Sequence, residues 1–443
     1  MRQRDIFWFW LPLFASWFLM TAEGPIIAAA INRLPDEIIM LAAMGIVSSL
    51  SITIESPIIN LLATSTALVR DHASYRLVRR FTIHWCLALT IIAILVAYTR
   101  LFDLIVPGLL DVPPEIAAWV RPGMRIMVFW SAAIGWRRFL QGILIRFNRT
   151  RAIALGTAVR LLASGGVAIV LAVLSQLPGV IIGALGLMSG VIAEALYATW
   201  AVRPVLRGEL AAGTPPAGGA ALTYRGLSAF HIPLAATSVL VLMLQPMVTS
   251  SLARLDQPTL TLAAWPIVFQ IALMARAGAM ALPEVVIALH HGATTFAPLR
   301  RFSLLLTAAL TAVMALFVFT PAGRFYIFGV QDMTDAAGAL ALASLPLFLL
   351  LPGLTTLVSW LRGLLIQGRH TRFVNIGMAA NLSLTAAVLI AGVVWRWPGL
   401  PTAALAMTLA LLGEVLYLTW RTRATLPVEL PLFGAPRAEQ LPL

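Results

Sequence analysis

The stretch EALYATW at 194–200 returns as EVLYLTW at 414–420, and this repetition decides the fold. At an offset of 221 residues, LAAMGIV at 41–47 aligns with LAAWPIV at 262–268. The same offset aligns Arg33-Leu34 with Arg254-Leu255, and the arginine pair before Phe81 with the pair before Phe302. Because one nearly constant offset holds across both halves, we interpret the chain as an internal duplication.

The composition places this duplication in a membrane. Of the 443 residues, 60% are hydrophobic and only 11% are charged, and the mean hydropathy is +0.91. Soluble chains carry about 25% charged residues. Too few polar side chains are present to cover a soluble enzyme, and fibrous and disordered chains have a more repetitive or more polar composition. A polytopic membrane protein remains.

The apolar stretches set the number of spans. Twelve are long enough to cross a bilayer, and they fall at about 7–31, 38–68, 81–99, 123–145, 152–174, 179–202, 227–252, 259–289, 303–320, 339–366, 373–394 and 399–420. Each half holds six, so both halves enter from the same side, and the repeat has a pseudo-twofold axis along the membrane normal. We predict an all-α integral membrane protein with twelve transmembrane helices in two six-helix bundles.

This pattern also predicts the domain organisation. The N-terminal bundle occupies residues 1–202, and the C-terminal bundle occupies 227–423. A Pro-, Gly- and Ala-rich cytoplasmic linker at 203–226 joins them. The tail 424–443 carries four prolines and is expected to be flexible. Two facing bundles suit alternating access around a site in the middle of the membrane.

The net charge of +13 predicts orientation. All 31 basic residues are arginine, and they are spread along the chain instead of clustered, which argues against nucleic acid as a partner. Nineteen fall in the termini and loops of one side and seven in loops of the other. The positive-inside rule therefore predicts a multi-pass protein of the bacterial inner membrane with both termini in the cytoplasm.

The residue types exclude several kinds of chemistry. The lone Cys86 excludes an intramolecular disulfide. The sequence has no phosphate-binding loop of the form GxxxxGK[ST], and its histidines lack metal-ligand spacing. We therefore expect no enzyme activity, no cofactor and no metal site.

Charged residues inside spans are the candidate functional groups, since a charge at the bilayer centre costs at least about 2.5–3.5 kcal/mol. Glu23 precedes Gly24-Pro25, and proline kinks a helix and frees carbonyl groups. Glu23 is therefore a candidate site for a coupling proton or sodium ion. The alternative is an acid that packs between helices and pairs with an arginine.

The candidate substrate-binding residues are Arg276, Arg160 and Glu55. Glu55 and Arg276 are counterparts at the offset of 221, so they could face each other across the axis as a gate that an anionic substrate opens. The alternative has each residue pair within its own bundle. Arg160 has the polar counterpart Asn381. Guanidinium groups bind carboxylate and phosphate in a bidentate manner, which favours an anion.

Glu194 and Glu414 occupy equivalent places in the sixth and twelfth spans. Their repetition indicates a structural task for both. We expect each to pair with a basic group of its own bundle.

Two six-span repeats joined by a linker resemble the multidrug/oligosaccharidyl-lipid/polysaccharide (MOP) flippase superfamily, which includes the MATE antiporters. The first two spans resemble the progressive ankylosis protein family in Glu23, Leu41-Ala42, Gly45, Ser49-Leu50 and Pro57. This resemblance implies export of polyanions such as pyrophosphate, nucleotides or citrate. The aspartate of the MATE first helix would fall near Ile27, where this chain has no acid.

Together these observations predict a monomeric secondary active exporter of a small anionic solute, with the cleft lined by the first, second, seventh and eighth spans. Its other partners would be membrane lipids and a coupling proton or sodium ion. Two alternatives stay open: a MATE-like multidrug antiporter coupled to cations or protons, and a lipid-linked saccharide flippase.

Overall fold

The computed structural model describes residues 2–147, 149–210, 222–290, 292–368 and 370–425. Within these ranges the ordered elements are all helical. Nine helices of the described chain are long and apolar enough to cross a membrane, and two of them run on into short elements. They are α1 (Gln3–Ile31), α2 (Glu37–Glu55) continuing through η1 (Ser56–Ile58) into α3 (Leu61–Leu68), α4 (His72–Tyr98), α8 (Thr150–Leu174), α9 (Gly179–Ala201) continuing into α10 (Arg203–Arg207), α13 (Pro258–Ala275), α16 (Ala293–Phe319), α20 (Thr371–Val394) and α21 (Gly399–Thr425).

Three further segments are broken. α18 (Asp335–Ser344), with the short η5 (Leu345–Phe348), meets α19 (Leu351–Gln367) at a bend of 42°. α6 (Pro114–Ile126) passes through η3 (Met127–Phe129) into α7 (Trp130–Arg146), and α11 (Tyr224–Leu242) is followed by α12 (Leu244–Ala253). Counting the bent pair as one span, ten of the described segments are long and apolar enough to cross a membrane. The segments α6–α7 and α11–α12 overlap the two remaining predicted spans, at 123–145 and 227–252.

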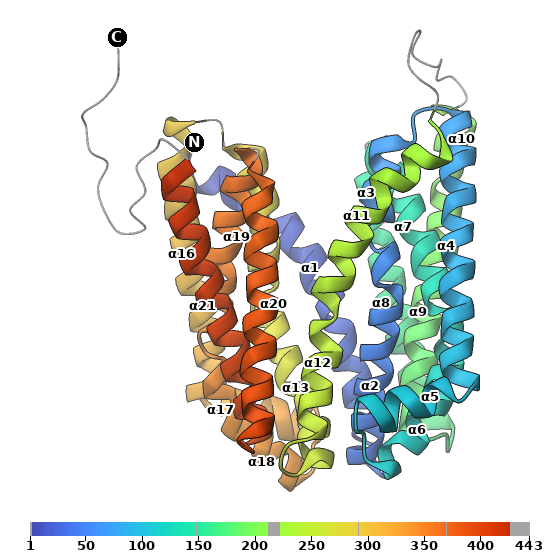
Figure 1. Cartoon of the computed structure of the whole chain (residues 1–443), viewed down its shortest axis with the longest axis vertical. Helices are drawn as coiled ribbons and strands as arrows, with labels where there is room; N and C mark the ends of the chain where they lie inside the picture. Colours follow the sequence, from blue (N-terminus) through green and yellow to red (C-terminus); the bar gives the residue numbers. More distant parts are fainter. Residues whose placement is uncertain (1, 148, 211–221, 291, 369, 426–443) are drawn as a thin grey trace.

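The helices form two bundles (Figure 1). The start of α1, the short α10 (Arg203–Arg207) and the start of α11 lie at one end, which we call the proximal end. The bundles diverge toward it and approach each other at the opposite, distal end. There α2 packs on α13 so closely that a Cβ atom added at Gly45 would lie 3.1 Å from the Pro266 ring. The predicted linker lies partly, and the predicted tail almost wholly, outside the described residues.

Close helix packing holds each bundle together. Gly142 of α7 faces α3, where an added Cβ atom would overlap the Ser65 hydroxyl and the Leu62 carbonyl. No other residue type fits without moving one helix. Its repeat counterpart Gly363 faces Val286 in the other bundle, where an added Cβ atom would lie 2.7 Å from the Val286 Cβ. The duplication therefore preserved one packing device in both halves.

The first span of each half also contacts the opposite bundle. Trp10 Nε1 of α1 donates to the Gly278 carbonyl at 2.9 Å, and α1 packs against the short α14 (Ala277–Met280). In return, Asn60 Nδ2 donates to the Leu234 carbonyl of α11 at 2.8 Å. His231 of α11 is fully buried and lies 2.9 Å from Thr64 Oγ1. The two halves thus exchange the proximal parts of their first spans.

Candidate functional site

A cavity of about 290 Å³ lies between the bundles. The first, second, seventh and eighth spans contribute to its wall through α1, α2, α12 and α13, and η3, α7, α8 and α9 complete it on the side of the N-terminal bundle. Its volume is close to the lower limit of the 300–1,000 Å³ typical of pockets for small molecules.

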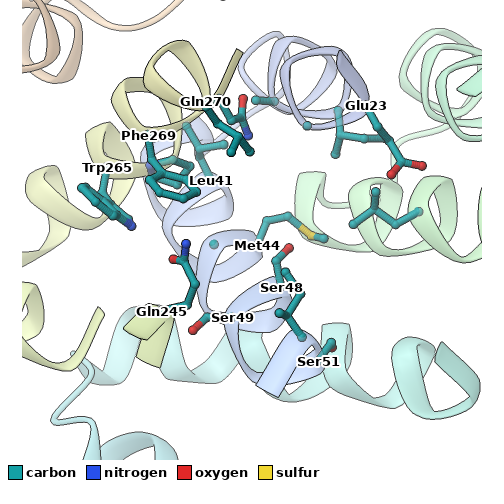
Figure 2. A pocket seen from close by; sticks show the side chains of 18 of the residues that line it. Glu23, Leu41, Met44, Ser48, Ser49, Ser51, Gln245, Trp265, Phe269 and Gln270 are labelled. Carbon is teal, nitrogen blue, oxygen red and sulfur yellow. The ribbon is translucent and has the colours of Figure 1, made fainter. Parts of the chain in front are cut away.

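The cavity wall combines aromatic, amide and hydroxyl groups. Trp265 and Phe269 of α13 lie beside Gln270, and Gln245 of α12 lies opposite Ser49 of α2 (Figure 2). Within the described chain, Ser49 Oγ and Gln270 Oε1 are buried and have no hydrogen-bond partner. Buried polar groups without partners are costly, so these two are suited to bind a ligand or water.

Two charged residues line the cavity, and they form an ion pair. Arg160 of α8 donates from Nε to both carboxylate oxygens of Glu23 at 3.0 Å, and its Nη2 lies 2.5 Å from Glu23 Oε2. The side chains are 15% and 8% exposed. Charge-assisted, multidentate geometry of this kind is what stabilises two charges away from water. In this state each charge neutralises the other.

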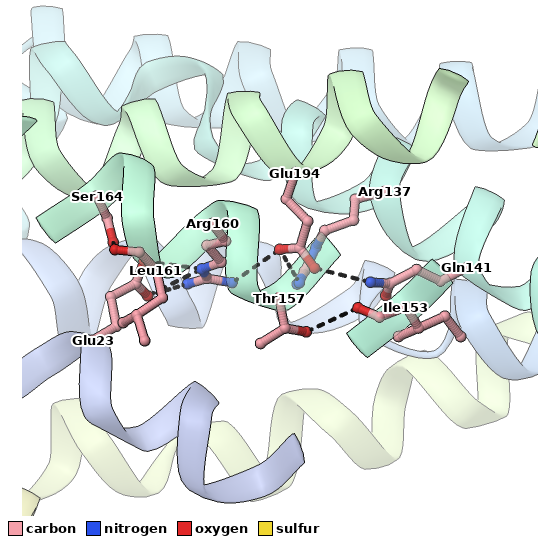
Figure 3. Close-up of polar contacts among 9 residues, drawn as sticks. All are labelled: Glu23, Arg137, Gln141, Ile153, Thr157, Arg160, Leu161, Ser164 and Glu194. Atoms are coloured by element: carbon pink, nitrogen blue, oxygen red, sulfur yellow. Dashed lines mark hydrogen bonds and ion pairs between the residues drawn. The ribbon is translucent and has the colours of Figure 1, made fainter. Parts of the chain in front are cut away.

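The pair continues into a buried network (Figure 3). The fully buried carboxylate of Glu194 accepts from Arg137 Nη1 at 2.6 Å and from Gln141 Nε2 at 3.0 Å, and Arg160 Nη1 lies 3.8 Å away. Two carboxylates therefore balance two guanidinium groups. The guanidinium of Arg160 thus presents Nη1 to Glu194, while its Nε and Nη2 face Glu23.

The other bundle repeats half of this network. Glu414, the counterpart of Glu194, accepts from Arg362 Nε at 2.8 Å and from Asn381 Nδ2 at 2.9 Å. At the offset of 221, Arg362 corresponds to Gln141 and Asn381 to Arg160. At these two positions each bundle therefore places one arginine and one amide beside its carboxylate, in exchanged order, and Arg137 is an additional donor to Glu194 whose counterpart is Val358. Glu194 and Glu414 pair within their own bundles, as expected.

Solved structures share this architecture. A multidrug resistance MATE family transporter of the MOP superfamily in its inward-facing conformation superposes with a TM-score of 0.71 at 12% identity, covering 92% of this chain and 94% of that one. An outward-facing conformation of such a transporter gives 0.63 at 15% identity and 95% of both chains. The lipid II flippase MurJ in an inward closed conformation gives 0.65 at 12% identity, covering 93% and 87%.

The chain has the MATE fold. No family model matches the sequence, and no curated protein matches it. At 12–15% identity the similarity establishes the architecture alone, and the chemistry of the site has to be argued from the residues of this chain. In this MATE fold the cavity is flanked by both bundles, and the Glu23–Arg160 pair belongs to the N-terminal one.

Glu55 and Arg276 do not come together in this structure. Both lie outside the residues that line the cavity. The nearest charges to Glu55 are arginines of its own bundle, and Arg276 lies over the Phe269 ring at 5.6 Å. Among the described residues Glu55 Oε2 and Arg276 Nε have no hydrogen-bond partner. Glu55 and Arg276 lie at the proximal ends of α2 and α13, where the two bundles diverge, so the hypothetical gate between them is not formed in this state. Within the part of the chain that the structure describes, the alternative ion pair inside its own bundle is formed by neither residue.

The search for charges in the sequence missed the uncharged part of the site. Gln245, Gln270, Trp265 and Phe269 carry no charge, so their residue types did not distinguish them from helix-packing residues. Gln141 could have been found, because it is the counterpart of Arg362 at the constant offset. Within the described residues, no three His, Cys, Asp or Glu side chains are grouped to hold a metal ion.

Proposed function

We propose that this chain is a secondary transporter that moves a small organic anion across a membrane by alternating access. The observation that carries the proposal is the Glu23–Arg160 ion pair in the wall of a cavity between two related bundles. The MATE fold and the polytopic composition support it. The polyanion export implied by the resemblance to the progressive ankylosis family is consistent with it.

The arginine distribution supports an orientation with the proximal end in the cytoplasm, in a bacterial inner membrane. The divergence of the bundles toward that end, and the higher TM-score with the inward-facing transporter, support an inward-facing state. We propose that a monomer carries out transport, since each chain holds both bundles.

The ion pair suggests how a proton and an anion are coupled. While Glu23 is ionised, it occupies the Nε and Nη2 donors of Arg160. When a proton binds the Glu23 carboxylate, this partner loses its charge, and the guanidinium can bind a carboxylate or phosphate of the substrate bidentately. Anion and proton then share the cavity and leave on the same side, so export would use the outward gradient of the anion.

Flux into proteoliposomes tests this proposal. We expect pH-dependent flux of citrate or pyrophosphate in the wild type, and loss of at least tenfold in Arg160→Gln. Glu23→Gln should retain anion flux but lose its dependence on pH, because the amide cannot titrate. Arg362→Gln with Glu414→Gln, which removes the equivalent ion pair outside the cavity without leaving a buried charge, is the matched control and should transport normally. Unchanged anion flux in Arg160→Gln would contradict the proposal.

A second candidate is a MATE-like exporter of cationic drugs. The aromatic faces of Trp130, Trp265 and Phe269 in the cavity wall favour it, since such rings attract organic cations. In that case Arg160→Gln should preserve or raise ethidium flux. A lipid-linked saccharide fits less well, because its headgroup is large for a cavity of about 290 Å³.

A further inference from the structure

Arg33, just beyond the distal end of α1, reaches across to the C-terminal bundle. Its Nη1 donates to the Ala29 carbonyl of its own helix at 2.5 Å. Its Nη2 donates to the Val330 carbonyl of the opposite half at 2.9 Å, and its Nε lies 3.9 Å from Asp332 Oδ2. One guanidinium group therefore links a helix end of one bundle to a loop of the other.

Arg254, just beyond the distal end of α12, makes the same link in the reverse direction. Its Nη1 donates to the Ser250 carbonyl of its own helix at 3.0 Å. Its Nη2 donates to the Leu109 carbonyl of the N-terminal half, and its Nε lies 3.8 Å from Asp111 Oδ2.

These two links are one contact made twice. At the offset of 221, Arg33 corresponds to Arg254, Ala29 to Ser250, Leu109 to Val330 and Asp111 to Asp332. We call the two sets the distal clasps: Arg33 with Val330 and Asp332, and Arg254 with Leu109 and Asp111. A chance contact in one half would not be reproduced, donor for donor, in the other.

The backbone around each acceptor is repeated as well. The acceptor carbonyls end the π-helical turns η2 (Leu104–Leu109) and η4 (Phe325–Val330). Asp111 and Asp332 then adopt left-handed conformations, with φ of 57° and 53°. Aspartate tolerates this region better than most residues do, so its presence at both positions fits the need to place a carboxylate after a carbonyl.

We propose that the distal clasps are the gate that keeps the distal side of the cavity closed, and that both must break when the cavity opens to that side. This inference rests on the proposed alternating access. The clasps join the two halves where the bundles meet, so separation of the distal ends must lengthen both. A contact made in one state and lost in the other shifts the balance between the states.

The test measures access to the cavity and needs no substrate. In a Cys86→Ser background, Ser49→Cys places a thiol in the cavity wall, and a membrane-impermeant maleimide is added on the distal side. We expect Arg33→Gln or Arg254→Gln to raise the labelling rate about 3- to 10-fold, and both together about 10- to 100-fold, because each removes a charge-assisted bond to a carbonyl.

Arg121→Gln is the matched control. Arg121 lies in α6 at the same end and pairs with Asp103, so its ion pair stays within one half. This substitution should leave labelling unchanged. Asp111→Asn with Asp332→Asn should have a smaller effect than the arginine changes, since both carboxylates are more than half exposed and the carbonyl bonds persist.

Wild-type labelling in the double arginine variant would overturn the inference, as would an equal rise in Arg121→Gln. If the double variant does not fold, Arg33→Lys with Arg254→Lys replaces it, because lysine keeps the charge but cannot span the three acceptors. At least a threefold rise is then expected, and no rise refutes the gate. Increased labelling in a protein that carries no anion would retain the gate and refute the proposed transport.

Discussion

Replacing Glu194 by glutamine should destabilise the N-terminal bundle more than the equivalent change destabilises the other. Glutamine keeps the size of the side chain but removes the charge that Arg137 and Arg160 share. The Arg137 side chain is only 4% exposed and cannot turn to water. Breaking a buried ion pair on one side costs about 3–5 kcal/mol.

The equivalent substitution Glu414→Gln is the comparison for this loss of stability. It leaves Arg362, whose side chain is 29% exposed and can be hydrated, so we expect less than half the cost. For a chain of 443 residues, the loss at Glu194 corresponds to a fall in the melting midpoint of roughly 3–5 °C. Heating in detergent followed by fluorescence-detected size-exclusion chromatography measures both midpoints.

A double variant separates charge from shape. Arg137→Gln with Glu194→Gln replaces the ion pair by two amides that can bond each other, so most of the lost stability should return. The reasoning is refuted if Glu194→Gln melts within 1 °C of the wild type (well below the roughly 3 °C minimum expected), if Glu414→Gln falls as far, or if the double variant costs the sum of the single changes.

Three further predictions concern other parts of the chain. Gly142→Ala should destabilise the protein by about 1–3 kcal/mol and more than Gly363→Ala, since the nearest backbone atom to the added methyl group would be the overlapping Leu62 carbonyl oxygen in the first case and Pro283 Cα at 3.3 Å in the second; melting midpoints of the two variants in detergent measure the difference. Asp71 caps α4, and its hydrogen bond from the Ser74 amide lowers the pKa of its carboxyl group below the ordinary value of 3.8. The ionised cap should therefore stabilise the folded state above about pH 4, and this stabilisation should be lost as the pH falls, so the melting midpoints of the wild type and Asp71→Asn should converge at acidic pH. Glu55 and Arg276 should form a proximal gate only when the cavity faces the distal side, so each charge reversal should abolish flux and the double reversal should restore it; a folded double variant without flux would exclude this gate.

The sequence carried most of the architecture. The repeat predicted which positions are equivalent, and the apolar stretches predicted twelve spans in two bundles, because the hydrophobic effect and the need to satisfy backbone groups in lipid act locally along the chain. The same offset marked Arg33 with Arg254 as equivalents, and it holds for Asp111 with Asp332. The offset could not show that Arg33 contacts Asp332 or that Arg254 contacts Asp111, since the two members of each contact lie in different halves of the chain.

Only the tertiary structure decided which charges pair. Glu55 and Arg276 are equivalent by sequence, yet Arg160 pairs with Glu23, whose own counterpart is Leu244. A side chain finds its partner through helix rotation, depth and the relative tilt of the bundles, and none of these is encoded in the spacing of residues. The sequence thus determined two related bundles with buried charges, while tertiary packing selected the ion pair in the cavity and the clasps at the distal end.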